Sequence, residues 1–294
     1  ATILSRDGPV GLVGAFSYVT LPAPPEKSLK QIMSRQPHTF VAPPSAWLVL
    51  TELPRALAEL GSLPLAAPLL MTAPRGDGHP VLVLPGMSTT DRSTALLRRY
   101  LSALGYDVHA WELGRNLGQR AIGLQGEKLI ARLEDIHATT ERKVTLVGHS
   151  LGGIIARQLS RRRPELVRQI VTLGSPFAGD PRSTNVWKLY EYLCGQRVSD
   201  PEIKAQLVES HNAPPVPSSA IYSKADGIVA WQSCLEPNTP TTENIEIPGS
   251  HVGLCFNPIA MFAVADRLAL PLGAWQPFTR GGLRALFYRS GHFH

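Results

Sequence analysis

The chain has 294 residues, of which 44% are hydrophobic and 18% are charged. This balance excludes an intrinsically disordered protein and is typical of a globular one that can bury a sizeable core. The net charge of +6 includes an arginine cluster at 161–163, which we interpret as a solvated helix end, although it could also attract anionic surfaces. So modest a charge, with no accompanying motif, predicts no nucleic-acid partner.

Cysteines and cofactor motifs are sparse. Three cysteines are too few for a disulfide framework, and the choice between one Cys234–Cys255 bridge and free thiols stays open. We expect no metal and no cofactor, because no H-E-x-x-H pattern and no phosphate-cradling glycine loop occur. The first residues do not resemble a signal peptide, so we expect a cytoplasmic or peripheral membrane location rather than secretion, although a processed secreted protein would begin in the same way.

Residues 1–75 differ in composition and hydrophobic pattern from the rest of the chain. A proline-rich arm, with a short helix near Ser28–Arg35, precedes a helical stretch at Ser45–Glu59. The apolar segment Ala46–Met71 is interrupted by charges and prolines, so it does not fit a membrane span. We expect it to pack on the core, with docking on a membrane surface as the alternative.

Residues 76–270 alternate between short apolar runs and amphipathic stretches. This alternation predicts an α/β core with a mostly parallel sheet covered by helices on both faces. The expected strands are Val81–Leu84, Tyr106–Trp111, Val144–Val147, Gln169–Leu173, Ala220–Tyr222 and Asn244–Ile247. The expected helices are Asp91–Leu104, with Asp91 as N-cap, and Ile122–Ala138, Leu151–Arg163 and Pro258–Ala269.

The alternation breaks between Pro176 and Pro217. Two helical patches, Trp187–Leu193 and Pro201–Ser210, follow one another there without a strand, so we expect a helical lid insertion above the sheet. The tail at 271–294 is rich in glycine and aromatic residues and has no predicted place.

The segment 148–152 reads Gly-His-Ser-Leu-Gly and matches the G-x-S-x-G nucleophile elbow. The string alone is weak, but here it directly follows an apolar strand and directly precedes a helix, which is the context the motif requires. Small residues permit the tight turn, and the helix N-terminus favours a developing negative charge beside Ser150. We therefore predict that Ser150 is a nucleophile rather than a simple N-cap.

A serine hydroxyl needs a base to accept its proton, and the base needs an acid to orient it. On a sheet of this kind the acid follows the serine in the chain, and the histidine follows the acid. Asp226 and His251 each lie in a loop just beyond a late strand, where parallel sheets build their sites. We predict His251 as the base and Asp226 as its partner. The rival acids are Asp180, Asp200 and Glu246, and the rival bases are His211, His137 and His109.

A tetrahedral intermediate needs two backbone donors. We predict the amide of Leu151, directly after the nucleophile, and that of Met87, in the turn that follows an earlier strand. An ordinary Pro85-Gly86 turn without a catalytic role is the alternative.

The segments VTLVGHSLGG, IYSKADGIV, PGSHVGL and VLVLPGM resemble the bacterial esterase and lipase branch of the α/β-hydrolases. The resemblance covers about Gly78 to Leu270 and implies the α/β-hydrolase fold with a Ser-His-Asp triad. It departs at Pro85-Gly86, where His-Gly is usual, and this puts the second oxyanion donor in question.

Aromatic and apolar residues of the lid suit an apolar acyl ester. We predict that Trp187, Tyr190 and Leu193, together with His149, bind substrate, although His149 could instead brace the elbow by packing. The predicted function is an esterase or lipase acting on a small-molecule or lipid ester, with possible peripheral membrane contact. An acyltransferase, a thioesterase, an amidase and a non-catalytic binding protein of the same fold remain alternatives.

Overall fold

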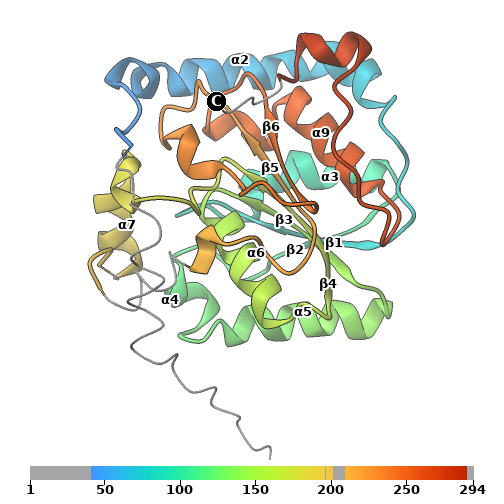
Figure 1. Ribbon diagram of the computed structural model, residues 1–294, viewed down its shortest axis with the longest axis horizontal. Coiled ribbons are helices and arrows are strands. Elements are labelled where there is room, and N and C mark those ends of the chain that lie inside the picture. The colour runs from blue at the N-terminus through green and yellow to red at the C-terminus, as the bar shows by residue number, and fades with distance from the viewer. Residues whose placement is uncertain (1–40, 196, 201–208, 290–294) are drawn as a thin grey trace, which may run out of the picture. The chain divides into compact units, whose positions relative to one another are not determined.

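The computed structural model describes residues 41–195, 197–200 and 209–289. Six strands form one sheet in the order β2-β1-β3-β4-β5-β6, and every neighbouring pair is parallel (Figure 1). The mostly parallel sheet predicted from the sequence is thereby confirmed. The strands are β1 (Pro80–Leu84), β2 (Asp107–Ala110), β3 (Val144–His149), β4 (Val167–Leu173), β5 (Ser218–Tyr222) and β6 (Thr242–Glu246).

Helices cover both faces of this sheet (Figure 1). One layer contains α2 (Ala46–Leu70), α3 (Ala95–Ala103) and α9 (Pro258–Leu268), and the other contains α5 (Glu127–Thr140) and α6 (Leu151–Arg162). Successive side chains of a strand point to opposite faces. Accordingly Val81 and Val83 pack into the core beneath the first layer, whereas Leu82 and Leu84 pack into the core beneath the second.

Two expected helices differ from the observed ones. The helix expected over Ile122–Ala138 begins later, as α5, and its first residue, Ile122, belongs to the short helix α4 (Gln119–Ile122). Gly123, with a φ of 93°, ends α4, and Gly126, with a φ of 71°, is the N-cap of α5. Asp91 is not the N-cap of the helix that follows it. Thr90 caps the 3₁₀ turn Asp91–Thr94, while the Asp91 carboxylate accepts hydrogen bonds from the amides of Trp111 and Glu112.

Helix α2 is longer than the predicted stretch Ser45–Glu59 and continues through three internal prolines. It packs against α9 and against the 3₁₀ turn Val252–Cys255. Within the described residues, no helix is both long and apolar enough to cross a membrane. The short helix predicted near Ser28–Arg35 lies outside the described residues.

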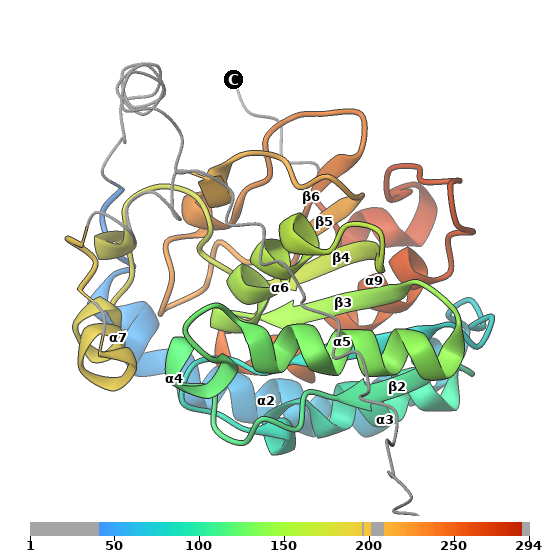
Figure 2. The ribbon, with the colours of Figure 1, turned by 90° about the horizontal axis from the view of Figure 1, so that it is seen from below.

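The insertion after β4 contains the 3₁₀ turn Pro181–Ser183 and helix α7 (Trp187–Cys194). Figure 2 shows α7 at the same end of the molecule as α4. Most of the second helical patch, Pro201–Ser210, lies outside the described residues. Its last two residues, Glu209 and Ser210, are described and are helical.

All three cysteines are buried free thiols, so the Cys234–Cys255 bridge left open by the sequence is not formed.

The tail, which the sequence left unplaced, returns to the edge strand β6. The amide of Phe278 donates a hydrogen bond of 2.7 Å to Glu243, and Arg289 pairs with Glu246 in an isolated antiparallel bridge. These contacts tie the described end of the chain to the last strand of the sheet.

A buried ion pair anchors α6 to the loop between β5 and β6. The side chains of Arg157 and Glu236 are fully buried and hydrogen-bonded to each other, and the guanidinium lies 3.8 Å from the centre of the Phe177 ring. Removing one partner of such a pair leaves an uncompensated charge in the interior.

Glu236→Ala should therefore lower the free energy of unfolding by about 3–5 kcal/mol, measured by urea denaturation. The control is Glu165→Ala, because Glu165 pairs with Arg163 at the surface and should cost less than about 1 kcal/mol. Equal effects of the two substitutions would contradict the structural importance of the buried pair.

Candidate active site

The carboxyl ends of β3, β5 and β6 bring the three predicted residues to one edge of the sheet. Ser150 directly follows β3, Asp226 follows β5, and His251 follows β6. Because β3 and β5 are separated by β4 alone, residues that are distant in sequence meet at this edge. This is where parallel sheets build their ligand sites.

Ser150 occupies a strained turn between β3 and α6. Its φ of 51° and ψ of −120° lie in a region that non-glycine residues rarely adopt. Two glycines permit this turn. A side chain at Gly148 would collide with the backbone of Gly153, and one at Gly152 would collide with the carbonyl oxygen of Leu84. Such strain is typical of functional residues held in place by their surroundings.

Asp226 and His251 form a buried hydrogen-bonded pair. His251 Nδ1 lies 2.6 Å from Asp226 Oδ2, and both side chains are almost completely buried. The other carboxylate oxygen of Asp226 accepts hydrogen bonds of 2.8 and 2.7 Å from the amides of Ile228 and Val229. The carboxylate is therefore fixed on both sides, and it orients the ring of His251.

The rival acids and bases are engaged elsewhere. The side chain of Asp180 caps the turn Pro181–Ser183, and that of Asp200 accepts from the amide of Arg197. Glu246 pairs with Lys224. His109 pairs with Asp107, and His137 contacts the carbonyl oxygen of Arg142. His211 lies in the connection that leads into β5, whereas Asp226 follows that strand.

The charge on His251 reflects two opposing effects. Burial alone disfavours the imidazolium, but the carboxylate of Asp226 beside it, with that of Glu52, outweighs burial and raises the pKa of His251 above its usual value. An imidazole held in this way can accept a proton from a neighbouring hydroxyl, and the carboxylate of Asp226 stabilises the imidazolium that forms.

His149 braces the site from beneath. Its Nε2 donates a hydrogen bond of 3.0 Å to the carbonyl oxygen of His251, and the two rings lie 5.1 Å apart. Burial and the neighbouring His251 lower the pKa of His149 to about 4, so it is neutral near pH 7. His149 does not line the substrate pocket described below, in contrast to its predicted binding role.

No hydrogen bond joins the hydroxyl of Ser150 to His251 among the described contacts. Such bonds are often long or absent until substrate binds. Gly174, which follows β4 with a φ of 55°, makes room for the acid–base pair. A side chain there would approach His251 Nδ1 to 3.1 Å and Asp226 Oδ2 to 3.3 Å. No sequence motif indicates this role of Gly174.

Met87 and Leu151, the predicted oxyanion donors, both line the pocket that contains Ser150. Neither backbone amide donates a hydrogen bond to another described residue. The amide of Leu151 belongs to the first turn of α6, whose N–H groups have no partner within a helix. Both amides are thus available to a ligand beside Ser150.

An apolar pocket opens at Ser150. Trp187 and Tyr190 of α7 line it, as the sequence predicted for substrate-binding residues, whereas Leu193 does not. Sequence reasoning missed Pro176, Thr184 and Val229, which also line it. Pro176 and Thr184 lie in the connection between β4 and α7, Val229 lies after β5, and none of the three belongs to a recognisable sequence motif.

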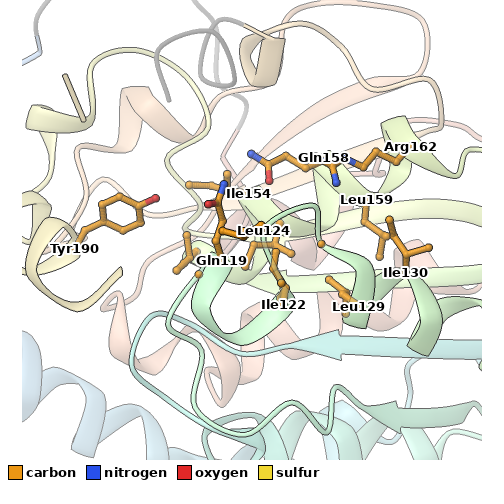
Figure 3. Close-up of a pocket in the computed structure, with 15 residues that line it drawn as sticks. Gln119, Ile122, Leu124, Leu129, Ile130, Ile154, Gln158, Leu159, Arg162 and Tyr190 are labelled. Atoms are coloured by element: carbon orange, nitrogen blue, oxygen red, sulfur yellow. The ribbon is translucent and has the colours of Figure 1, made fainter. Parts of the chain in front are cut away.

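A second pocket adjoins the first along α6 (Figure 3). The two share the lining residues Leu151, Ile154, Gln158 and Tyr190. Figure 3 shows Tyr190 at one end and Arg162 at the other. Within the described residues, no cluster of three or more histidine, cysteine or acidic side chains could hold a metal ion.

Comparisons with known proteins find similarity over part of this chain. A family model described as "PGAP1-like alpha/beta domain" matches residues 114–210, which include Ser150 but neither Asp226 nor His251. Two triacylglycerol lipases, from Pseudarthrobacter phenanthrenivorans and Burkholderia plantarii, are each 29% identical over 108 residues. These matches cover 34% of this chain and 34% and 30% of the respective relatives, so the chain spans about a third of their length.

The crystal structure of Aspergillus fumigatus lipase B aligns with a TM-score of 0.51 and 20% sequence identity. The alignment covers 65% of this chain and 52% of the lipase. At this identity the likeness concerns the fold. The chain has the α/β-hydrolase fold predicted from its sequence. The proteins that are similar to it in sequence include triacylglycerol lipases.

The pKa values of the neighbouring His149 and His251 should be shifted in opposite directions from the usual value of a histidine. We expect the ring of His251 to titrate above its usual pKa and that of His149 near pH 4. Nitrogen-15 NMR of the imidazole rings measures both values directly. Asp226→Asn removes the charge that favours the imidazolium, so it should lower the pKa of His251. An unchanged pKa in this variant would contradict the assigned pairing.

Proposed function

We propose that this α/β-hydrolase is a carboxylic ester hydrolase that acts through Ser150, His251 and Asp226. The observation that carries the proposal is the buried Asp226–His251 hydrogen bond at the edge of the sheet where Ser150 occupies its strained turn. The lipase relatives support the same reaction class, although each match covers about a third of the chain.

In the proposed reaction, Ser150 Oγ attacks the ester carbonyl carbon while His251 Nε2 accepts the hydroxyl proton. Asp226 holds Nδ1 and stabilises the imidazolium. The amides of Leu151 and Met87 donate hydrogen bonds to the oxyanion of the tetrahedral intermediate. The C–O bond to the alcohol then breaks, and His251 gives its proton to the leaving alcohol.

The acyl-enzyme left on Ser150 is hydrolysed by the same groups. His251 accepts a proton from water, whose oxygen attacks the acyl carbonyl carbon, and the second tetrahedral intermediate collapses to release the acid and restore Ser150. An acyltransferase would follow the same course with another acceptor in place of water.

The pocket favours an ester with an apolar acyl chain. The walls beside Ser150 are formed by Ile154, Trp187, Val198 and other apolar groups, and the second pocket extends this surface along α6. A mainly apolar pocket with few polar groups binds an aliphatic chain better than a sugar or nucleotide.

Ser150→Ala should lower kcat/KM on p-nitrophenyl esters by at least about a thousandfold, because the nucleophile is lost. Wild type and variant are assayed on chain lengths from acetate to palmitate, and labelling of the wild type with a fluorophosphonate reports the nucleophile without turnover. Equal activity in the two proteins would overturn the assignment of Ser150. Preference for an added alcohol over water would indicate an acyltransferase.

We also propose that α2 contacts a membrane or lipid surface peripherally. Several of its apolar side chains are exposed, among them Trp47 (71%), Leu50 (73%), Leu53 (63%), Leu57 (59%) and Leu65 (87%). An apolar helix face of this kind can lie in the interfacial region of a bilayer.

The combined substitution Leu50→Glu, Leu53→Glu and Leu57→Glu should abolish co-sedimentation with phosphatidylcholine vesicles, because charged groups are expensive to bury in lipid. Leu124→Glu is the matched control, since Leu124 is 77% exposed but lies between α4 and α5. Wild type that stays in the supernatant would overturn the proposed contact.

A further inference from the structure

Helix α2 contains two acidic residues, Glu52 and Glu59, in an otherwise mainly apolar sequence. Both side chains point away from bulk water and toward the loops that contain Asp226 and His251. Glu52 is only 4% exposed, and burying a carboxylate is costly unless hydrogen bonds replace its hydration. The partners of these two carboxylates therefore show what the helix stabilises.

Glu52 binds the backbone of both catalytic loops at once. Its Oε1 accepts hydrogen bonds from the amide of Gly227 at 2.7 Å and from that of His251 at 3.2 Å. Its Oε2 accepts another of 3.2 Å from the amide of Val252. One carboxylate thus joins the residue after Asp226 to His251 itself.

Two further side chains of α2 extend this connection. Glu59 Oε1 accepts a hydrogen bond of 2.6 Å from the amide of Ser250. Arg55 donates a hydrogen bond of 2.5 Å to the carbonyl oxygen of Ala225 and one of 3.0 Å to Glu52. The residues on both sides of Asp226, and those on both sides of His251, are consequently bound to a single helix.

Each catalytic loop has a glycine where α2 comes closest. A side chain at Gly227 would collide with the carbonyl oxygen of Leu48 and approach Glu52 Cγ to 2.9 Å. A side chain at Gly253 would collide with the carboxylate of Glu59. The loops therefore fit the helix closely at the same two points where the carboxylates bind.

We propose that α2 is a positioning element of the active site, in which Glu52, supported by Glu59 and Arg55, holds the loops of Asp226 and His251 at the spacing that their hydrogen bond requires. This inference rests on the proposed ester hydrolase function. Glu52 does not line the substrate pocket, so it is a positioning residue that acts through His251 and Asp226.

The negative charge of Glu52 provides a second effect. It favours the imidazolium of His251 together with Asp226, and so contributes to the raised pKa. Among the described residues, the other titratable or charged groups near this ring are His149, whose ring lies 5.1 Å away, Arg55 beside Glu52, and Glu59, about two helical turns beyond Glu52. Loss of Glu52 removes one of the two carboxylates that raise the pKa of His251.

The test compares Glu52→Ala and the isosteric Glu52→Gln with wild type on a short-chain p-nitrophenyl ester. Misplacement of the base and acid should lower kcat about 10- to 100-fold, with little change in KM because the pocket is untouched. Activity falls as the pH decreases through the pKa of His251, and this fall forms the acid limb of the pH–rate profile. Because loss of the Glu52 charge lowers the pKa of His251, the acid limb should move to lower pH in both variants. Ala58→Ser, at an exposed position of the same helix, should match wild type in both respects.

Hydrogen exchange of the amides of Gly227, His251 and Val252 gives a readout that is independent of turnover. These three amides should exchange faster in Glu52→Ala, and thermal unfolding identifies any variant that does not fold. Glu52→Gln keeps the size of the side chain and separates the charge effect from a packing defect.

The outcomes separate this inference from the proposed function. If wild type hydrolyses esters while both Glu52 variants keep its kcat and its acid limb, the positioning role is wrong and the hydrolase proposal stands. If wild type is inert and is not labelled by a fluorophosphonate, the hydrolase proposal fails. In that case unchanged amide exchange in Glu52→Ala also overturns the positioning role, and faster exchange supports it.

Discussion

Burial of the central strands on both faces is the constraint on which the rest of this structure depends. Every residue of β1, β3, β4 and β5 is buried. Side chains on these strands therefore cannot reach solvent or a ligand. Polar groups that interact with solvent or ligand must therefore lie beyond the strand ends. The order of the strands then decides which loops meet there.

The two ends of the sheet use polar residues differently. At the amino end, His79 lies 2.5 Å from Asp77 and 3.0 Å from Thr145, an arrangement that resembles a catalytic triad. Both His79 and Thr145 are completely buried, so this group connects β1 to β3. At the carboxyl end, the strained turn places Ser150 at an open pocket beside an acid–base pair. Access to a ligand, rather than residue identity, distinguishes the two groups.

Helix α2 connects the outer layer to the chemistry at the carboxyl end. One face of the helix binds the backbone of two loops through buried carboxylates, while the opposite face exposes apolar side chains. A helix with this composition is ambiguous from sequence, because a mainly apolar segment can pack into a core or lie on a lipid surface. Within the described part of the chain, α2 packs on the core through Ala56 and Leu70, and its opposite face is apolar and exposed.

The sequence by itself determined the alternation of strands and helices, the parallel sheet and the turn at Ser150, because these features depend on periodicity and on small residues within a few positions of one another. It also predicted Asp226 and His251 from their places beyond strand ends. Only the tertiary structure decided the packing role of His149 and the contacts of Glu52. The hydrogen bonds of Glu52 cross 175 to 200 positions of the chain. No local pattern encodes them, because they exist only once the loops and α2 have packed together.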